Sequence, residues 1–254
     1  MSLGLGSNLT KSGIVTPGIV TDNLVLKHKY DAGGVVPVSD GAAYFDGNDD
    51  YITVGDQSSL DFGTGDFSVS FWVKLITDAT VSLLGKQDNS SGWYIYYESG
   101  TNVAFYHRKD NKYTNGSTDL LNNQWNHIVF TRDGAVGKIY FNGVNDTAST
   151  NDISADLDSA GDNFEIARRN LGATDDRYAN CNMCNIGVWN AVLTEAQVKS
   201  IMNKNYAGLT DSDKDAGTTG SSNLVSWWNL DSSYKILSNL YVTDSHGSND
   251  GTLT

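Results

Sequence analysis

Cysteine and proline, the two residues that most restrict a chain, are almost absent from this sequence. Its 254 residues include two cysteines and two prolines. Cys181 and Cys184 are three positions apart, and on an extended strand such residues point to opposite faces, so we expect no disulfide between them. A zinc site needs four ligands, and neither a second cysteine pair nor a histidine pair accompanies these two. The sequence therefore predicts two reduced thiols.

Glutamate is nearly as scarce. Glu98, Glu165 and Glu195 lie on unrelated segments, and all other acids are aspartates. Retaining glycoside hydrolysis needs two carboxyl groups about 5 Å apart, and no Glu-x-Asp-x-x-Glu run supplies them on one strand. A Gly-x-Ser-x-Gly nucleophile motif is also missing. An aspartate pair remains an alternative, but we expect no enzymatic activity.

The chain has few basic residues and no long apolar run. Seventeen bases against 30 acids give a net charge of −13, which repels nucleic-acid phosphates, so we exclude DNA and RNA as partners. No stretch approaches the roughly eighteen apolar residues of a membrane-spanning helix. The start, "MSLGLGSNLT", lacks the basic and apolar regions of a signal peptide. We expect neither membrane insertion nor a signal peptide.

Short apolar runs between turn residues are abundant instead. The 26 glycines, with many Asn, Asp and Ser residues, separate these runs. In "FSVSFWVKL", Phe67, Val69, Phe71 and Val73 alternate on one face, which is typical of a half-buried strand. Many such strands in series predict an all-β fold, a two-sheet antiparallel jelly-roll sandwich.

One segment has a helical period. In "LTEAQVKSIMNKNY", Thr194 and Gln197 form a capping-box pattern, and Val198, Ile201 and Met202 follow on one face. We expect this helix to pack flat on the sandwich.

The two ends of the chain differ in composition from its middle. Residues 1–40, rich in Gly, Ser, Thr and Val, predict an extended arm, which is either an anchor on a partner subunit or a flexible terminus. Residues 41–206 contain the jelly-roll domain. Residues 207–222 predict a polar linker, in which the EF-hand pattern of "DSDKDAGTTGSS" fails because Ser222 stands where a glutamate is required.

Residues 223–254 contain an apolar segment close to the end of the chain. A truncated second domain would leave this segment as an exposed apolar edge, so we expect 224–230 to be a strand that returns to close the same sandwich. Pleating places Trp227 and Trp228 on opposite faces, one in the core and one outward.

Several stretches, in this order and spacing, resemble a laminin-G-like or pentraxin-like domain of the concanavalin A-like lectin and glucanase superfamily. The resemblance covers about residues 42–206 and is carried by "AYFDGNDDYITVG", "FSVSFWVK", "WNHIVFTRDG", "GKIYFNG", "FEIAR" and "IGVWNAVLTEAQVKSI". It implies a jelly roll that binds glycans, proteins or lipids, often through calcium. Similar domains occur in bacteriophage structural proteins, which implies a virion or extracellular surface, with virion subunits or further copies of the chain as partners of the arm.

The resemblance also implies a calcium site. Pentraxin-like domains take calcium ligands from an Asp-Asn pair, which Asp88 and Asn89 in "KQDNSSGW" match. Their second ligand cluster follows the "FEIAR"-like strand, where this chain has two arginines instead of acids. Asp175 and Asp176 could restore the oxygen ligands. The acidic turn "FDGNDDY" we interpret as a structural turn rather than a metal site.

Lectin-like sites stack sugars on exposed aromatic rings and bind hydroxyl groups with polar side chains. Candidate glycan-binding residues are Trp93, Tyr113, Arg168, Arg169 and Tyr178, which lie beside predicted loops. The alternative is that these aromatic residues belong to the core. We expect a non-enzymatic surface-binding module for glycans. The competing hypotheses are a purely architectural subunit and a carbohydrate-active enzyme.

Overall fold

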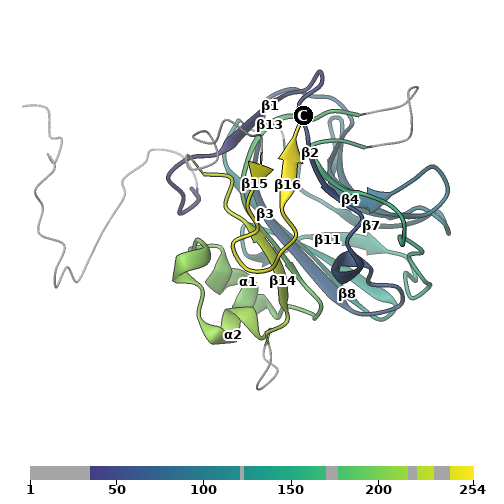
Figure 1. Ribbon diagram of the computed structural model, residues 1–254. Helices are drawn as coiled ribbons and strands as arrows, with labels where there is room; N and C mark the ends of the chain where they lie inside the picture. The colour runs from purple at the N-terminus through teal and green to yellow at the C-terminus, as the bar shows by residue number, and fades with distance from the viewer. Residues whose placement is uncertain (1–34, 121–122, 170–176, 217–221, 232–240) are drawn as a thin grey trace, which may run out of the picture. The chain divides into compact units, whose positions relative to one another are not determined.

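The structure is a computed structural model that describes residues 35–120, 123–169, 177–216, 222–231 and 241–254. All of them belong to one unit, Gly34–Thr254. Most of the predicted arm lies outside these residues. Two antiparallel sheets form the unit, and Figure 1 labels their strands.

The seven-stranded sheet contains, in spatial order, β1 (Ala43–Asp46), β13 (Asn180–Trp189), β3 (Phe67–Leu75), β8 (Asn126–Asp133), β9 (Val136–Phe141) and β10 (Val144–Asn145), with β14 (Leu224–Trp228) also paired to β13. The nine-stranded sheet contains β11 (Thr147–Thr150), β7 (Lys112–Gly116), β6 (Asn102–His107), β5 (Gly92–Glu98), β4 (Val81–Gln87), β12 (Phe164–Ile166), β2 (Ile52–Gly55), β16 (Gly251–Leu253) and β15 (Tyr241–Val242). The predicted fold class, an antiparallel two-sheet sandwich, is confirmed.

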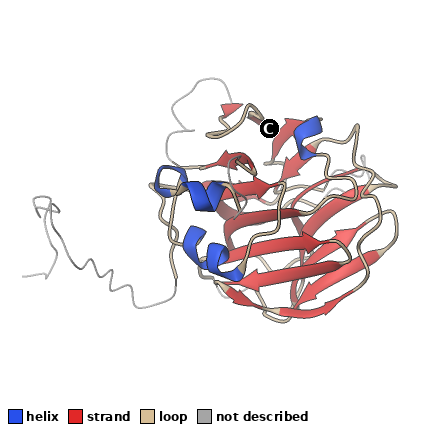
Figure 2. Ribbon diagram, turned by 90° about the horizontal axis from the view of Figure 1, so that it is seen from below, coloured by secondary structure: helices blue, strands red, loops and turns tan. Residues whose placement is uncertain are grey.

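The core lies between the two sheets and follows the alternation of the sequence. Phe67, Val69, Phe71 and Val73 of β3 are fully buried in it. Across the core, the rings of Phe105 and Phe130 stack with centroids 4.0 Å apart. Strands fill the sandwich and the short helices lie at its margins (Figure 2). No helix in the described ranges is long and apolar enough to cross a membrane.

The C-terminal segment returns to the sandwich. β14 pairs with the second half of β13, from Ile186 to Trp189, whereas β1 pairs with its first half. Because β3 occupies the other edge of β13, β1 and β14 share one edge end to end. Further along the chain than β14, β16 extends the nine-stranded sheet by pairing with β2. The last residues of the chain therefore contribute strands to both sheets.

Trp227 and Trp228 point to opposite faces of β14, but both are buried. Trp228 lies in the main core. Trp227 lies in a second cluster with Trp189, whose ring is nearly perpendicular to it at 6.1 Å. The same cluster includes Val198 and Ile201 of the first helix. The tryptophan predicted to face outward is therefore covered by the chain's own helical segment.

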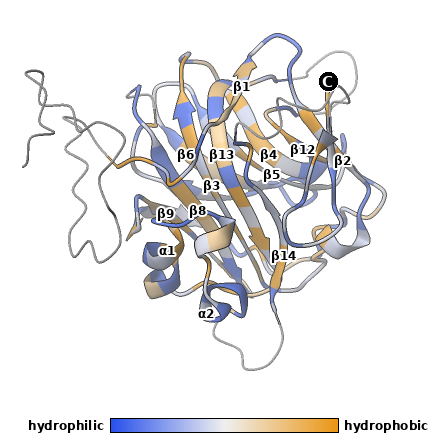
Figure 3. Cartoon of the chain, turned by 60° about the vertical axis from the view of Figure 1, so that its left-hand side comes forward, coloured by the Kyte–Doolittle hydropathy of each residue, from blue (hydrophilic) through white to orange (hydrophobic). Residues whose placement is uncertain are grey.

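The helices behave partly as predicted. α1 (Glu195–Ile201) has the expected capping box between Thr194 and Gln197. A second helix, α2 (Asp211–Lys214), lies inside the predicted polar linker. Its Asp213 is buried and forms an ion pair of 2.6 Å with Lys204. Figure 3 shows α1 beside β9 and α2 near β14, so this part of 207–222 is packed against the sandwich rather than a spacer.

Candidate functional site

The outer face of the nine-stranded sheet has a row of tyrosines across three neighbouring strands. Tyr94 of β5 lies directly opposite Tyr106 of β6, which lies directly opposite Tyr113 of β7. The ring centroids are 5.2 Å apart for the first pair and 4.6 Å for the second. Tyr96 lies 5.3 Å from Tyr94 on the same strand. We call these four residues the tyrosine row.

Two members of the row offer ring surface. Tyr94 and Tyr96 are only 7% and 8% exposed, whereas Tyr106 and Tyr113 are partly buried and lie at the margin of the cluster. The hydroxyl groups of Tyr106 and Tyr113 both donate to Asn111 Oδ1, at 2.9 and 3.1 Å. This asparagine therefore fixes the two rings from the β6–β7 turn.

The hydroxyl groups of Tyr96 and Tyr113 remain protonated at neutral pH. Burial raises the pKa of Tyr96 above its usual value, and the charge of Glu98 adds to this effect. Burial also raises the pKa of Tyr113. Neutral phenols both donate and accept hydrogen bonds, so the row presents flat apolar surface edged by versatile polar groups.

Gly85 of β4 makes room for the row. It is the direct cross-strand partner of Tyr94. A Cβ atom at this position would lie 2.5 Å from Tyr94 Cβ, far inside the contact distance of two carbon atoms. The missing side chain therefore lets the Tyr94 side chain approach the backbone of β4.

Two arginines extend this face from the end of β12. Arg169 donates from Nη1 to the Tyr94 hydroxyl at 3.2 Å. The guanidinium of Arg168 lies 4.2 Å from the ring centroid of Tyr51 and 5.6 Å from that of Tyr178. Such cation–π contacts orient the guanidinium groups over aromatic rings. Of the predicted glycan-binding residues, Tyr113 forms one end of the tyrosine row and Arg169 contacts its other end at Tyr94. Arg168 and Tyr178 contact each other.

The prediction for Trp93 is wrong. Its side chain is fully buried and packs against Phe67 and Phe164, at ring distances of 5.1 and 6.1 Å. Trp93 precedes Tyr94 on β5, so the pleat points it into the core. Its ring cannot stack on a sugar.

The described half of the predicted calcium site is a closed turn. Asp88 Oδ1 accepts hydrogen bonds from the backbone N–H groups of Ser90 and Ser91, at 2.6 and 2.7 Å, and these bonds lower the pKa of Asp88. The backbone carbonyl of Asn89 accepts from Arg108 Nε at 2.9 Å. These hydrogen bonds account for the conformation of the loop, and calcium binding by Asp88 and Asn89 stays a prediction. The other two predicted ligands, Asp175 and Asp176, lie outside the described residues.

The acidic turn between β1 and β2 brings three carboxylates close together. Oxygen atoms of Asp46, Asp49 and Asp50 lie within 4.8 Å of one another, the one such trio of potential ligands among the described residues. Asp46 accepts from the backbone N–H and side-chain amide of Asn48, at 2.8 and 3.0 Å, and Asp50 accepts from the Asp46 N–H at 3.2 Å. These bonds account for the acids as parts of a tight turn.

Residues 46–199 match a laminin G model described as the concanavalin A-like lectin/glucanases superfamily. The chain belongs to this superfamily. The matched residues include β2 to β13 and therefore every strand that carries the tyrosine row.

One protein sequence and two crystal structures illustrate what the chain is similar to. A non-toxic nonhemagglutinin of Clostridium botulinum is 25% identical over 114 residues, which are 44% of this chain and 10% of that protein. A crystal structure from Bacteroides ovatus, described as a candidate carbohydrate-binding protein, has a TM-score of 0.66 at 19% identity and covers 86% of this chain and 59% of its own. A SAP-like pentraxin of Limulus polyphemus has a TM-score of 0.52 at 18% identity, over 66% and 84%. At these identities the structural likenesses are likenesses of fold.

Sequence reasoning found one end of the tyrosine row and missed Tyr94, Tyr96 and Tyr106. The signal was present in "GWYIYYE" and "NVAFYH", where tyrosines alternate with core residues. However, both faces of β5 carry aromatic residues, so alternation alone does not tell which face is outward. Cross-strand register was needed to bring the tyrosines together.

Proposed function

We propose that this superfamily member is a non-enzymatic carbohydrate-binding module and that its tyrosine row is the glycan-binding face. The main observation in support is the pair of partly buried rings of Tyr106 and Tyr113. Their centroids lie 4.6 Å apart, and both hydroxyl groups donate to Asn111 Oδ1. The likeness to a candidate carbohydrate-binding protein of the same fold is in agreement.

The chemistry of the face suits a sugar ring. The C–H face of a pyranose packs on a flat aromatic surface, while its hydroxyl groups exchange hydrogen bonds with polar groups at the rim. Tyr106 and Tyr113 supply the surface. The side-chain N–H groups of Asn111 and of Arg169 supply donors at its two ends. Because strands and hydrogen bonds already order these side chains, little conformational entropy is lost on binding.

We propose that this face binds without calcium. Asp88 is engaged by its own turn, and the described carboxylate trio lies in the β1–β2 turn rather than on β5, β6 or β7. Binding would then rest on ring stacking and on hydrogen bonds with uncharged phenols.

The positions of the glutamates support a role without catalysis. Glu98 lies on β5 and Glu165 on β12, with β4 between the two strands. Glu165 and Tyr94 both pair with Gly85 of β4, so they lie level with each other across the sheet. Glu98 is four residues further along β5 than Tyr94. Standard strand spacing and rise then separate the Cα atoms of Glu98 and Glu165 by roughly 16 Å. Glu165 Oε1 accepts from Thr53 Oγ1 at 3.3 Å, and β2, which carries Thr53, lies on the side of β12 away from β5, so this carboxyl group is directed away from Glu98. The carboxyl groups of a glycosidase pair lie at most about 9.5 Å apart.

A finer proposal concerns where the module acts. The resemblance to phage structural proteins leads us to propose display in many copies on a virion surface, where avidity compensates for weak single sites. Its support is the resemblance alone. Flanking genes that encode capsid or tail proteins would favour it, and a neighbourhood of unrelated genes would contradict it.

The test of the main proposal is a glycan array. Purified protein should bind one or more immobilised glycans, with and without EDTA, and the Tyr106→Ala/Tyr113→Ala double variant should lose that signal while it remains folded. Binding that survives in the double variant would place the site elsewhere, and no binding to any glycan would refute the function.

A further inference from the structure

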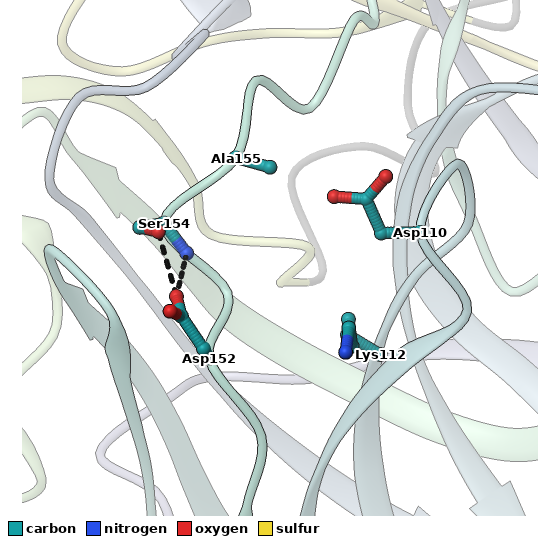
Figure 4. A pocket seen from close by; sticks show the side chains of 5 residues that line it. All are labelled: Asp110, Lys112, Asp152, Ser154 and Ala155. Carbon is teal, nitrogen blue, oxygen red and sulfur yellow. Dashed lines mark hydrogen bonds between the residues drawn. The ribbon is translucent and has the colours of Figure 1, made fainter.

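A small pocket lies at the edge of the sandwich, beside the β6–β7 turn. Asp110 of the β6–β7 turn and Lys112, the first residue of β7, form one wall, and Asp152, Ser154 and Ala155 form the other. Its volume is about 210 Å³. Figure 4 shows the two walls facing each other, with the carboxylate of Asp110 directed toward the opposite side. Pockets for drug-sized ligands measure about 300–1,000 Å³, so this one suits a smaller polar group such as one sugar residue.

The wall formed by residues 152–155 is fixed from behind. Asp152 Oδ1 accepts hydrogen bonds from the backbone N–H and the hydroxyl of Ser154, at 3.0 and 2.6 Å. Arg132, whose side chain is fully buried, donates from Nη2 to the backbone carbonyls of Ser154 and Ala155, at 2.9 and 2.8 Å. A buried arginine that grips the backbone makes this wall rigid before any ligand arrives.

The wall formed by Asp110 and Lys112 has a hydrogen-bond acceptor, the Asp110 carboxylate. The His107 side chain is fully buried behind it, and its Nε2 bonds the backbone carbonyl of Asp156 at 3.1 Å. His107 Nδ1 has no hydrogen-bond partner and lies 3.9 Å from Asp110 Oδ2, too far for a hydrogen bond. The Asp110 carboxylate is therefore positioned beside the pocket with capacity to accept hydrogen bonds from a ligand.

The pocket and the tyrosine row share two segments of chain. Asn111, which holds the Tyr106 and Tyr113 hydroxyls, stands between Asp110 and Lys112. On the other side, Asn151 exchanges two hydrogen bonds with the Tyr113 backbone, of 2.9 and 2.8 Å, and Asn151 immediately precedes Asp152. Lys112 pairs with the buried His107, and Tyr113 pairs with Tyr106, so pleating puts Lys112 and the tyrosine rings on opposite faces of β7. A glycan chain on the rings reaches the pocket by passing over the β6–β7 turn at Asn111.

We propose that this pocket is a second subsite that binds one neutral, hydroxyl-rich sugar residue of a glycan chain lying on the tyrosine row. The inference rests on the proposed function. Asp110 and Asp152 accept hydrogen bonds from sugar hydroxyls, and Lys112 donates. Two carboxylates against one ammonium group, on a chain of net charge −13, disfavour acidic sugars.

Backbone amide shifts in NMR test the two subsites separately. The probes are millimolar galactose, glucose, mannose, xylose, arabinose and N-acetylglucosamine, with galacturonate and glucuronate as acidic counterparts that differ from galactose and glucose only at C6. Ser154 and Ala155 report on the pocket, and Tyr106 and Tyr113 on the row. A neutral sugar should shift both sets, and its acidic counterpart should leave the pocket amides unchanged.

A variant that fills the pocket completes the test. Ala155→Phe places a ring in the pocket and leaves the carbonyl that binds Arg132 in place, and Ala148→Phe on exposed β11 is the matched control. With the glycan that the array selects, Ala155→Phe should weaken binding about tenfold, while Ala148→Phe should not.

Each outcome has a distinct meaning. Shifts of the Tyr106 and Tyr113 amides without shifts of the pocket amides, or full affinity in Ala155→Phe, would overturn the pocket subsite and leave the proposed function standing. No shifts in either set with any sugar would overturn both, and pocket shifts with the acidic counterparts would overturn the selectivity for neutral sugars.

Discussion

Trp228 of β14 stacks on Phe164 of β12, with ring centroids 5.4 Å apart and planes tilted by 19°. The contact joins the two sheets, and the indole N–H donates to the backbone carbonyl of Asn249 at 2.9 Å. This side chain thus connects the end of the chain to the core. Removing this side chain should affect the whole sandwich rather than its end.

We therefore expect Trp228→Ala to lower the free energy of unfolding by about 3–5 kcal/mol, as large core truncations do. Urea denaturation followed by fluorescence measures this loss. Truncation after Gly220, which removes β14 and β16, should lower the melting temperature further. Tyr44→Ala, at a position that is 52% exposed, is the control and should change stability little. An unchanged melting temperature after truncation would show that the C-terminal strands are dispensable.

Asp162 should make stability depend on pH. Burial, and then the charge of Asp88, raise its pKa to about 6 from an ordinary value of 3.8, and its Oδ2 atom is buried without a hydrogen-bond partner. Between these two pH values the folded chain holds the proton more tightly than the unfolded chain. Stability contributed by the protonated group is therefore lost as the pH rises through this window.

Replacing this carboxyl group should remove the effect. Asp162→Asn should be more stable than the wild type at neutral pH, on the order of 1 kcal/mol after allowing for solvent screening, and about equal to it near pH 4. Urea denaturation at both pH values measures the difference, with the exposed Asp133→Asn as control. A gain of the same size at both pH values would contradict the assignment.

Calcium should be dispensable for binding at the tyrosine row. Because Asp88 is engaged by the N–H groups of Ser90 and Ser91, Asp88→Asn should leave glycan affinity within about twofold. Dialysis against EDTA should have equally little effect. Titration calorimetry with and without calcium measures both. Loss of binding in EDTA, restored by calcium, would show that glycan binding depends on the metal.

Strand composition predicts the sandwich but not which residues are accessible on its faces. In β3 the apolar residues Phe67, Val69, Phe71 and Val73 mark the inner face directly. In β5 both parities are aromatic, so Trp93 and Tyr94 are equally good candidates for the surface until register is known. Burial in the structure assigns Trp93 to the core.

The position of Trp227 also depended on distant residues. Pleating correctly predicts that Trp227 and Trp228 face opposite sides of β14, but it does not tell which of them faces the main core. The cover of Trp227 comes from α1 and from residues around α2, inside the segment expected to be a linker. The sequence "LTDSDK" gave a capping pattern only one turn long, too short to distinguish a helix from a polar loop. Tertiary packing of Asp213 against Lys204 made the difference.

The affinity of single tyrosine variants for the array-selected glycan tests the central claim most directly. Titration calorimetry should show that Tyr106→Ala and Tyr113→Ala each weaken binding about tenfold or more, because each removes half of the stacking surface, while Tyr44→Ala on the opposite sheet binds as the wild type does. Wild-type affinity in both Tyr106→Ala and Tyr113→Ala, with the folded state intact, would contradict it.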